Sequence, residues 1–549
     1  MSLLKAWVQR AHVISWTLLG MLLISAVVVR VYGLHAFHLS PDEALHLAEA
    51  NARTLATFFT FLRQEDTHPP LHYLLNHLIL TVTGKGIMEA RLASLIPGIL
   101  LIPLFYHLGR ITSGRAAGLF MAFLATFGIE SVVQSQAIRP YALLLFLIGA
   151  ALACLMHYKR TERPTFLICY VVAFGLAIVT HFSAAIAVAA VGTVNTIELL
   201  LKRKSLRQLI AWLGAHLFLA VEGALLYNLL ISDSANNTYF REEIVHDWLR
   251  SGFPLGQPIV QWFMNLLRIC DSLSIWVLPW GGLVLIFLTL AGGIVAWKRQ
   301  QPELTLYLLV ALAANVGLAL LKLYPFSGGR WCLFLLPFFF LLAGSAVQAV
   351  WDKMKAELKV RQAPRHLIVY SLPLGIGAVA IIATTFIVFH HNQYRTITEF
   401  PVTERVYQQV INLLDHHGSQ DEIIVSSKTT AYYAFFESSI ENVGQISPNV
   451  GRVPFRNMEL FFFKNASLIS SSSQLLTLFR DVKNFVGENP PKQVWIFDLG
   501  WGNPSVFLHL PRTEAVSKIN LPPCTPISAV CLFPLPWSYI ESSLSAVDN

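Results

Sequence analysis

Two adjacent carboxylates, Asp42 and Glu43, stand in the stretch His38-Leu-Ser-Pro-Asp-Glu-Ala-Leu45, shortly after an apolar run that ends near Val31. The Ser-Pro before them and Glu43 form a helix start, with Ser as N-cap, Pro at the first helical position and Glu closing a capping box. Capping accounts for Glu43 but not for Asp42 beside it. We therefore interpret the stretch as a site-forming loop at a membrane surface, in which the cap directs Asp42 to act as a general base.

The composition is that of an integral membrane protein. Of 549 residues, 55% are hydrophobic and 13% are charged, and this charged fraction is half that of an ordinary soluble domain. Lys and Arg fall in short clusters between apolar runs, as in cytoplasmic loops, so nucleic-acid binding is not expected. The six cysteines show no zinc-binding spacing, and Cys524 and Cys531 are the two that could form a disulfide.

About eleven apolar runs are long enough to cross some 30 Å of hydrocarbon as helices. They lie at 13–31, 87–108, 116–133, 141–156, 165–181, 184–200, 209–231, 274–297, 304–323, 331–350 and 367–389. Six basic clusters fall on the side of the N-terminus, which the positive-inside rule makes cytoplasmic. The Asp42 loop, the 134–140 connection, the 232–271 loop and the C-terminal region then lie on the extracytoplasmic face.

The chain is thus predicted to be a mainly α, polytopic membrane protein with a C-terminal extracytoplasmic α/β domain. Residues 1–390 form the transmembrane catalytic domain, whose first outer loop, 33–85, carries two helices separated by Pro69-Pro70. Residues 391–549 form the soluble domain, with a helix at 403–415, strands at 422–426 and 493–497, and a helix after Ser473. The soluble domain shows no phosphate-binding loop or nucleophile elbow, so we assign it no chemistry.

Several motifs occur in a characteristic order between Val13 and Phe389. They are Pro-Asp-Glu in the first loop, His68-Pro-Pro-Leu-His-Tyr-Leu-Leu75, Glu89-Ala-Arg-Leu-Ala-Ser94, Gln134-Ser-Gln-Ala-Ile-Arg-Pro-Tyr-Ala142, Thr180-His-Phe182 and Gly328-Gly-Arg-Trp331. Together they resemble the GT-C type membrane glycosyltransferases, in the branch of protein mannosyltransferases and the lipid A aminoarabinose transferase. The family often has an acidic residue after the second Gln of Gln-Ser-Gln; here it is Ala137.

The resemblance implies a GT-C fold and an inverting glycosyltransferase of the hexosyl or pentosyl type, with the acidic loop residues Asp42 and Glu43 as its catalytic groups. It implies a polyprenyl-phosphate sugar as donor, and a lipid, glycan or protein as acceptor. It also places the site on the extracytoplasmic face of a plasma (inner) membrane. No metal ligands are assigned, and a divalent cation is left open as a cofactor.

A lipid-linked sugar phosphate already carries a good leaving group, so the enzyme needs a base for the acceptor and cations for the departing phosphate. Arg139, Arg330, Lys85 and Arg91 all fall at extracytoplasmic ends of spans, and we predict them as phosphate-binding residues. Snorkelling to lipid headgroups is the alternative for each.

Substrate-binding residues are predicted next to these cations: His68, Tyr141, Gln136 and His181. The histidines on this face could also serve as metal ligands, but they do not form a tight ligand motif, so structural or substrate contacts are the preferred interpretation.

A transporter or flippase is the alternative function, with Glu222, Glu130 and His216 as an ion path. Glu222 lies within an apolar run and is expected to face the protein interior, paired with His216 or with a polar group of another helix. Inverted halves are not evident in the sequence, and the ionisable groups gather at one face rather than at the midplane. A non-catalytic scaffold is a second alternative.

Overall fold

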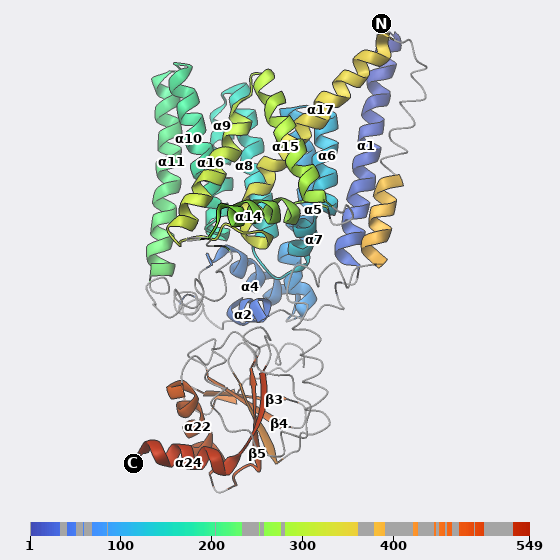
Figure 1. Ribbon diagram of the computed structural model, residues 1–549. Coiled ribbons are helices and arrows are strands. Elements are labelled where there is room, and N and C mark those ends of the chain that lie inside the picture. Colours follow the sequence, from blue (N-terminus) through green and yellow to red (C-terminus); the bar gives the residue numbers. More distant parts are fainter. Residues whose placement is uncertain are drawn as a thin grey trace. The chain divides into compact units, whose positions relative to one another are not determined.

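The computed structural model divides the chain into two compact units, Met1–His35 with Arg53–Tyr394, and Ala36–Ala52 with Arg395–Asn549 (Figure 1). We call them the helical unit and the sheet unit. The residues that the structure describes are 2–32, 34, 41–50, 59, 68–84, 86–203, 205–232, 252, 257–275, 280–360, 378–389, 421–426, 444–445, 450–455, 458–463, 472–487, 489–498 and 531–548.

In the described residues, the helical unit consists mainly of apolar helices. They include α1 (Ser2–Val31), α4 (Leu71–Thr83), α5 (Ile87–Thr112), α6 (Arg115–Phe127), α7 (Ile129–Gln136), α8 (Tyr141–Thr161), α9 (Pro164–Thr180), α10 (Ala184–Leu201), α11 (Leu206–Leu226), α14 (Ile259–Ser272), α15 (Gly281–Lys298), α16 (Glu303–Leu320) and α17 (Leu336–Val360). A π-helical turn, η2 (Tyr227–Ile231), extends α11, and a 3-10 helix, η5 (Gly329–Leu335), leads into α17.

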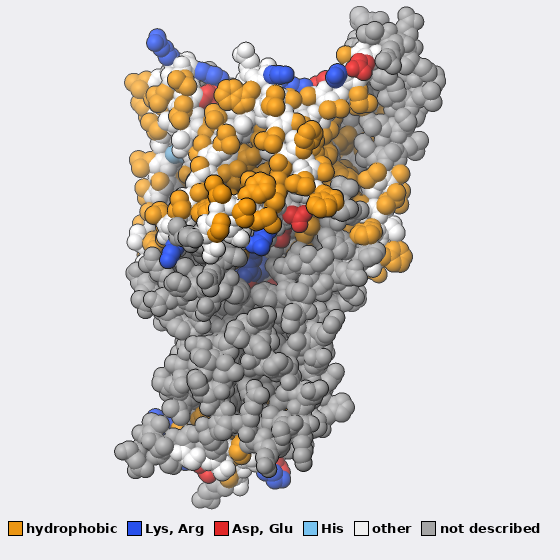
Figure 2. All heavy atoms as spheres, in the orientation of Figure 1, with side chains coloured by type: hydrophobic (Ala, Val, Ile, Leu, Met, Phe, Trp, Pro, Cys, Tyr) orange, Lys and Arg blue, Asp and Glu red, His pale blue; other side chains and the backbone are white. Residues whose placement is uncertain are grey.

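Eight helical segments of the described residues are long and apolar enough to cross a membrane, and 115–127, 164–180 and 378–389 are shorter apolar helices. All of the predicted spans fall on these segments, at least in part. In Figure 2, hydrophobic side chains cover the visible flank of these helices, and Lys and Arg gather at its upper rim. The prediction of a mainly α, polytopic membrane protein is confirmed.

One predicted span is wrong, and one predicted loop contains a helix that the sequence analysis did not identify. The span predicted at 116–133 is interrupted at Gly128, whose ψ of 135° is extended; α6 ends before it and α7 begins after it. The break has a physical reason, because α7 carries polar side chains such as Glu130 and Gln134, which are buried in protein instead of facing lipid. The predicted loop 232–271 contains the helix α14, which crosses the long helices in Figure 1.

Helix packing in this unit depends on close backbone approach at glycines. A Cβ on Gly109 of α5 would lie 2.8 Å from the Cα of Gly118 on α6, and a Cβ on Gly292 of α15 would overlap the carbonyl oxygen of Leu342 on α17. Lipid gives no hydrophobic drive for helices to associate, so small residues that permit tight contact stabilise the bundle. In the most apolar part of the segment containing α17, 83% of the residues are buried, whereas the corresponding share for α11 is 11%.

Glu222 on α11 faces the protein, as predicted, but His216 is not its partner. A Cβ on Gly175 of α9 would lie 2.8 Å from Glu222 Oε2. Both ring nitrogens of His216 are bound elsewhere, Nε2 to the Tyr170 hydroxyl at 3.0 Å and Nδ1 to the Trp212 carbonyl at 3.0 Å.

The sheet unit contains a mixed sheet of order β2-β3-β4-β1-β5-β6. The strands are β1 (Glu422–Ser426), β2 (Gly444–Gln445), β3 (Val450–Phe455), β4 (Met458–Phe463), β5 (Gln493–Asp498) and β6 (Cys531–Pro536). The central strand β1 pairs in parallel with β4 and β5, and the outer pairs are antiparallel.

Among the described residues of this unit there are also the helices α2 (Pro41–Ala50), α22 (Ser472–Val486) and α24 (Trp537–Asp548). Buried side chains such as Leu478 and Ile540 line the inner faces of α22 and α24. The strands predicted at 422–426 and 493–497 and the helix after Ser473 are confirmed. The helix predicted at 403–415 and a Cys524–Cys531 pairing fall outside the described residues and side chains.

Candidate functional site

A buried arginine, Arg139, occupies the short non-helical segment 137–140 between α7 and α8. Its side chain is 5% exposed. Its Nη2 atom lies 3.4 Å from Nε2 of His68, and its Cζ lies 6.0 Å from the ring centre of Tyr141. A guanidinium only donates, so His68 accepts through Nε2 and carries its own proton on Nδ1. A cation is thus held beside two polar rings at the start of an apolar helix.

The rings around Arg139 come from three separate segments. The ring centres of His68 and His181 are 5.3 Å apart, and those of Tyr141 and His181 are 5.0 Å apart. His181 follows the last residue of α9, and its Nδ1 lies 2.8 Å from the Ser183 hydroxyl. The structure therefore gathers three of the predicted substrate-binding residues around one predicted phosphate-binding residue.

A second basic residue, Arg330, lies in the 3-10 helix η5, directly before α17. Its Cζ lies 5.2 Å from the ring of Trp331. Gly329 has φ +71°, a conformation that favours glycine, and its N–H donates to Ser272 Oγ at 2.8 Å. The start of η5, next to Arg330, is thus held by a hydrogen bond from its first residue.

Tyr324 connects the surroundings of the two arginines. Its hydroxyl donates to the Trp331 carbonyl at 3.0 Å. Burial of the hydroxyl raises the pKa of Tyr324 well above its usual value; the nearby Tyr141 adds to the rise, and Ser183 and Arg330 oppose it. Tyr141 lies beside Arg139, and Arg330 is the second arginine. Because both act on Tyr324, the two arginines border one region of the helical unit. At neutral pH, Tyr324 is a neutral donor.

The two acidic candidates begin α2 in the sheet unit. Pro41 is the first residue of this helix, as predicted, and Asp42 and Glu43 occupy its first turn. Glu43 is fully buried, whereas Asp42 is partly exposed. The difference agrees with a supporting position for Glu43 and an accessible one for Asp42; their catalytic roles stay predictions.

The remaining candidates hold the end of α1 or lie outside the described residues. Gln136 donates from Nε2 to the carbonyls of Val29 at 3.2 Å and Arg30 at 3.1 Å. Arg91 is fully buried and donates from Nη1 to the Leu34 carbonyl. Both side chains thus bind backbone, and the predicted ligand contacts of Arg91 and Gln136 stay predictions. Lys85 is not among the described residues.

Arg30 is a positioning residue that the sequence analysis missed. It is fully buried near the end of α1, and its guanidinium donates to Ser135 Oγ at 3.1 Å, to the Thr126 carbonyl at 3.1 Å and to the Ala125 carbonyl at 2.8 Å. These bonds fix the break between α6 and α7. One signal could have identified it: a basic residue at the end of a span opposite to the predicted cytoplasmic clusters.

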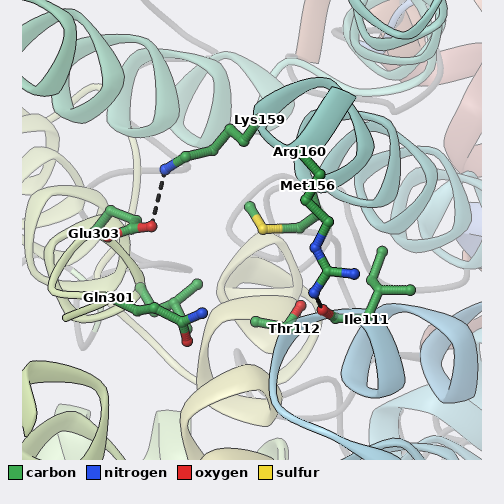
Figure 3. Close-up of a pocket in the computed structure, with 8 residues that line it drawn as sticks. Ile111, Thr112, Met156, Lys159, Arg160, Gln301 and Glu303 are labelled. Atoms are coloured by element: carbon green, nitrogen blue, oxygen red, sulfur yellow. Dashed lines mark hydrogen bonds and ion pairs between the residues drawn. The ribbon is translucent and has the colours of Figure 1, made fainter. Parts of the chain in front are cut away.

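A cavity of about 100 Å³ lies at the other end of α8 (Figure 3). In Figure 3, Lys159 points toward Glu303 and Arg160 toward Ile111. Lys159 Nζ binds Glu198 at 2.7 Å and Glu303 at 2.9 Å, which ties α8 to α10 and α16. At 1.5 Å per residue, this ion cluster is roughly 30 Å along α8 from Arg139, so it does not belong to the Arg139 site.

Across the residues that the structure describes, no group of three or more His, Cys, Asp or Glu side chains is arranged to hold a metal ion. The sequence-based assignment without metal ligands stays a prediction.

Known proteins share this fold. The crystal structure of ArnT from Cupriavidus metallidurans bound to undecaprenyl phosphate matches with a TM-score of 0.53 at 13% identity, covering 94% of this chain and 98% of that one. ArnT in the apo state matches with a TM-score of 0.52 at 14% identity, covering 96% and 98%. The fold is therefore that of the GT-C membrane glycosyltransferases.

Within that class, residues 67–227 match the family model of dolichyl-phosphate-mannose-protein mannosyltransferases. The matched segment contains Arg139 and the three rings around it. The resemblance predicted from the motifs is thus confirmed. No curated protein matches the chain in sequence.

Proposed function

We propose that this protein transfers a sugar from a polyprenyl-phosphate donor to a lipid, glycan or protein acceptor on the extracytoplasmic face of a plasma (inner) membrane. The observation that carries the proposal is the buried Arg139, held with His68, Tyr141 and His181 at the start of an apolar helix. A polyprenyl phosphate must keep its chain in the bilayer and its charged head at the water boundary. A cation at the end of a span meets that requirement.

The relatives support this choice of donor. The ArnT crystal structure is that of a complex with undecaprenyl phosphate, and the matched family is described by its dolichyl-phosphate-mannose donor. Both are lipid monophosphates, so the chemistry common to them is a phosphate head on a polyprenyl chain.

The reaction follows from the charges. Asp42 accepts the proton of the acceptor hydroxyl, whose oxygen forms a bond to the anomeric carbon as the bond from that carbon to the phosphate oxygen breaks. Arg139 and Arg330 stabilise the charge that grows on the leaving phosphate. Attack opposite the leaving group inverts the anomeric configuration. Glu43 supports Asp42, and His68, Tyr141 and His181 contact the donor head.

Arg139→Lys and Arg330→Lys test the phosphate contacts, because Lys keeps the charge but loses the planar fork that binds phosphate through two bonds. A bond between charged groups contributes about 1.5–3 kcal/mol, so we expect donor binding to weaken by roughly tenfold or more. Donor affinity and turnover are measured on purified, folded enzyme. Wild-type values in both variants would mean that these arginines do not bind the phosphate.

Asp42→Asn tests the base, since it keeps the size of the side chain and removes its charge. We expect a loss of turnover of at least about a hundredfold with little change in donor affinity. Glu43→Gln is the matched control and retains more activity. Near-normal transfer by Asp42→Asn would remove Asp42 from the mechanism.

A further inference from the structure

A chain of buried hydrogen bonds leads from α4 to the peptide of Arg139. Asn76 Nδ2 lies 3.3 Å from His72 Nδ1, His72 Nε2 lies 3.0 Å from Ser94 Oγ, and Ser94 Oγ lies 2.8 Å from the Arg139 carbonyl oxygen. Asn76, His72 and Ser94 are fully buried. The chain joins α4, α5 and the segment 137–140, and the mechanism above uses none of its three side chains.

The direction of every bond follows from its last acceptor. A carbonyl oxygen can only accept, so Ser94 donates its one hydroxyl proton to Arg139. The Ser94 oxygen must then accept from His72, which places the imidazole proton on Nε2. The bare Nδ1 of His72 in turn accepts from the amide of Asn76. One neutral tautomer of His72 satisfies all three bonds.

The surroundings keep His72 in that neutral form. Burial, and after it the positive charge of Arg139 and the nearby His68, together lower the pKa of His72 from 6.5 to about 3. Protonation would place a second cation next to Arg139 in a buried site. At neutral pH, the chain of bonds therefore has a fixed polarity.

We propose that Asn76, His72 and Ser94 form a one-way hydrogen-bond relay that fixes the Arg139 peptide and so directs its guanidinium toward the donor phosphate. The proposal rests on the proposed function, in which Arg139 binds that phosphate. Segment 137–140 is not helical, and Pro140 offers no N–H to hold it. The bond from Ser94 thus adds a restraint to a peptide that lies between two helices, which makes these three side chains positioning residues.

Two pairs of variants separate the relay from general packing. Ser94→Ala removes the donor to Arg139, whereas Ser94→Thr keeps a hydroxyl. His72→Gln places an amide donor where Nε2 stands, whereas His72→Leu removes it. The binding probe is farnesyl monophosphate, a short polyprenyl monophosphate, titrated into the purified full-length protein in detergent, and melting temperatures identify any variant that fails to fold.

We expect Ser94→Ala and His72→Leu to weaken farnesyl monophosphate binding by about tenfold, the equivalent of one hydrogen bond of about 1.4 kcal/mol, and the Thr and Gln variants to stay within about threefold of wild type. In turnover assays, the loss appears in the KM for the donor and leaves the KM for the acceptor unchanged. Equal binding by Ser94→Ala and Ser94→Thr would overturn the relay.

A double-mutant cycle shows whether the effect passes through the guanidinium. In an Arg139→Gln background, Ser94→Ala should have no further effect on binding, because the side chain that the relay directs is gone. An undiminished effect of Ser94→Ala in that background would overturn the relay. If Arg139→Gln itself binds the probe as wild type does, the phosphate assignment in the proposed function fails instead, and the relay fails with it. Weaker binding by Arg139→Gln together with unchanged binding by Ser94→Ala would overturn the relay alone.

Discussion

Replacing Arg30 by Met should destabilise the helical unit strongly. Met keeps a long apolar stem but removes the donors that hold the α6–α7 break. Three bonds of 3.1 Å or less connect the guanidinium to Ser135, Thr126 and Ala125. At about 1.5–3 kcal/mol for each bond to a charged group, their sum is roughly 5–9 kcal/mol. The cost of burying a charge offsets several kcal/mol of this.

The net loss is therefore about 3–5 kcal/mol, the usual range for disrupting a buried charge interaction. The assay is thermal unfolding of the purified protein in detergent, with hydrogen exchange followed at the amides of 124–136. Arg163→Met, at an exposed arginine before α9, is the matched control and should change stability by no more than about 0.5 kcal/mol. Arg30→Lys should be intermediate, because Lys keeps the charge without the fork.

The reasoning fails if Arg30→Met unfolds at the same temperature as Arg163→Met and shows the same exchange at the α6–α7 break. In that case, the carbonyls at the end of α6 would be satisfied without Arg30, and the position of Arg139 would not depend on it.

Gly292→Ala should destabilise the protein by at least about 1–3 kcal/mol, because the added methyl overlaps the Leu342 carbonyl. Gly317→Ala on α16, where nothing lies within 4 Å, should instead stabilise the protein by about 0.5–1 kcal/mol. Equal melting temperatures of the two variants would contradict both predictions. The pKa of His72 is 6.5 in the unfolded chain and about 3 in the folded protein. As the pH is lowered between these values, the free energy of unfolding should therefore decrease by up to about 1.36 kcal/mol per pH unit. His72→Gln should have a shallower dependence of melting temperature on pH, and parallel curves would refute the assignment. A reporter that is active only in the cytoplasm should be silent when fused after Gln393, and an active fusion would reverse the predicted topology.

The helices could be predicted from the sequence because run length alone decides whether a helix can span a membrane. The same criterion missed the break at Gly128, since apolar residues continue to Val133 and only Glu130 and Ser131 interrupt them. It also missed α14, whose apolar residues Ile259, Val260 and Phe263 follow helical spacing within a segment too short and too polar to span.

Part of the site could be predicted from the same apolar runs. Polar residues at the ends of such runs need a physical explanation, and this criterion identifies Arg139, His68, Tyr141 and His181. The bonds of Arg30 and Ser94 could not be predicted, since their acceptors include backbone carbonyls, which every residue possesses. Only the folded chain shows which carbonyls these side chains reach.

The ion cluster around Lys159 bears on the order in which the helices assemble during synthesis. Arg30 can bind its partners once residue 135 has entered the membrane, and the rings around Arg139 are complete once His181 follows. Lys159 can bind Glu198 once α10 has been synthesised. Its second partner, Glu303, lies 144 residues further along the chain and becomes available later. The rings around Arg139 can therefore assemble before the Lys159 ion cluster, which is complete only when α16 has inserted.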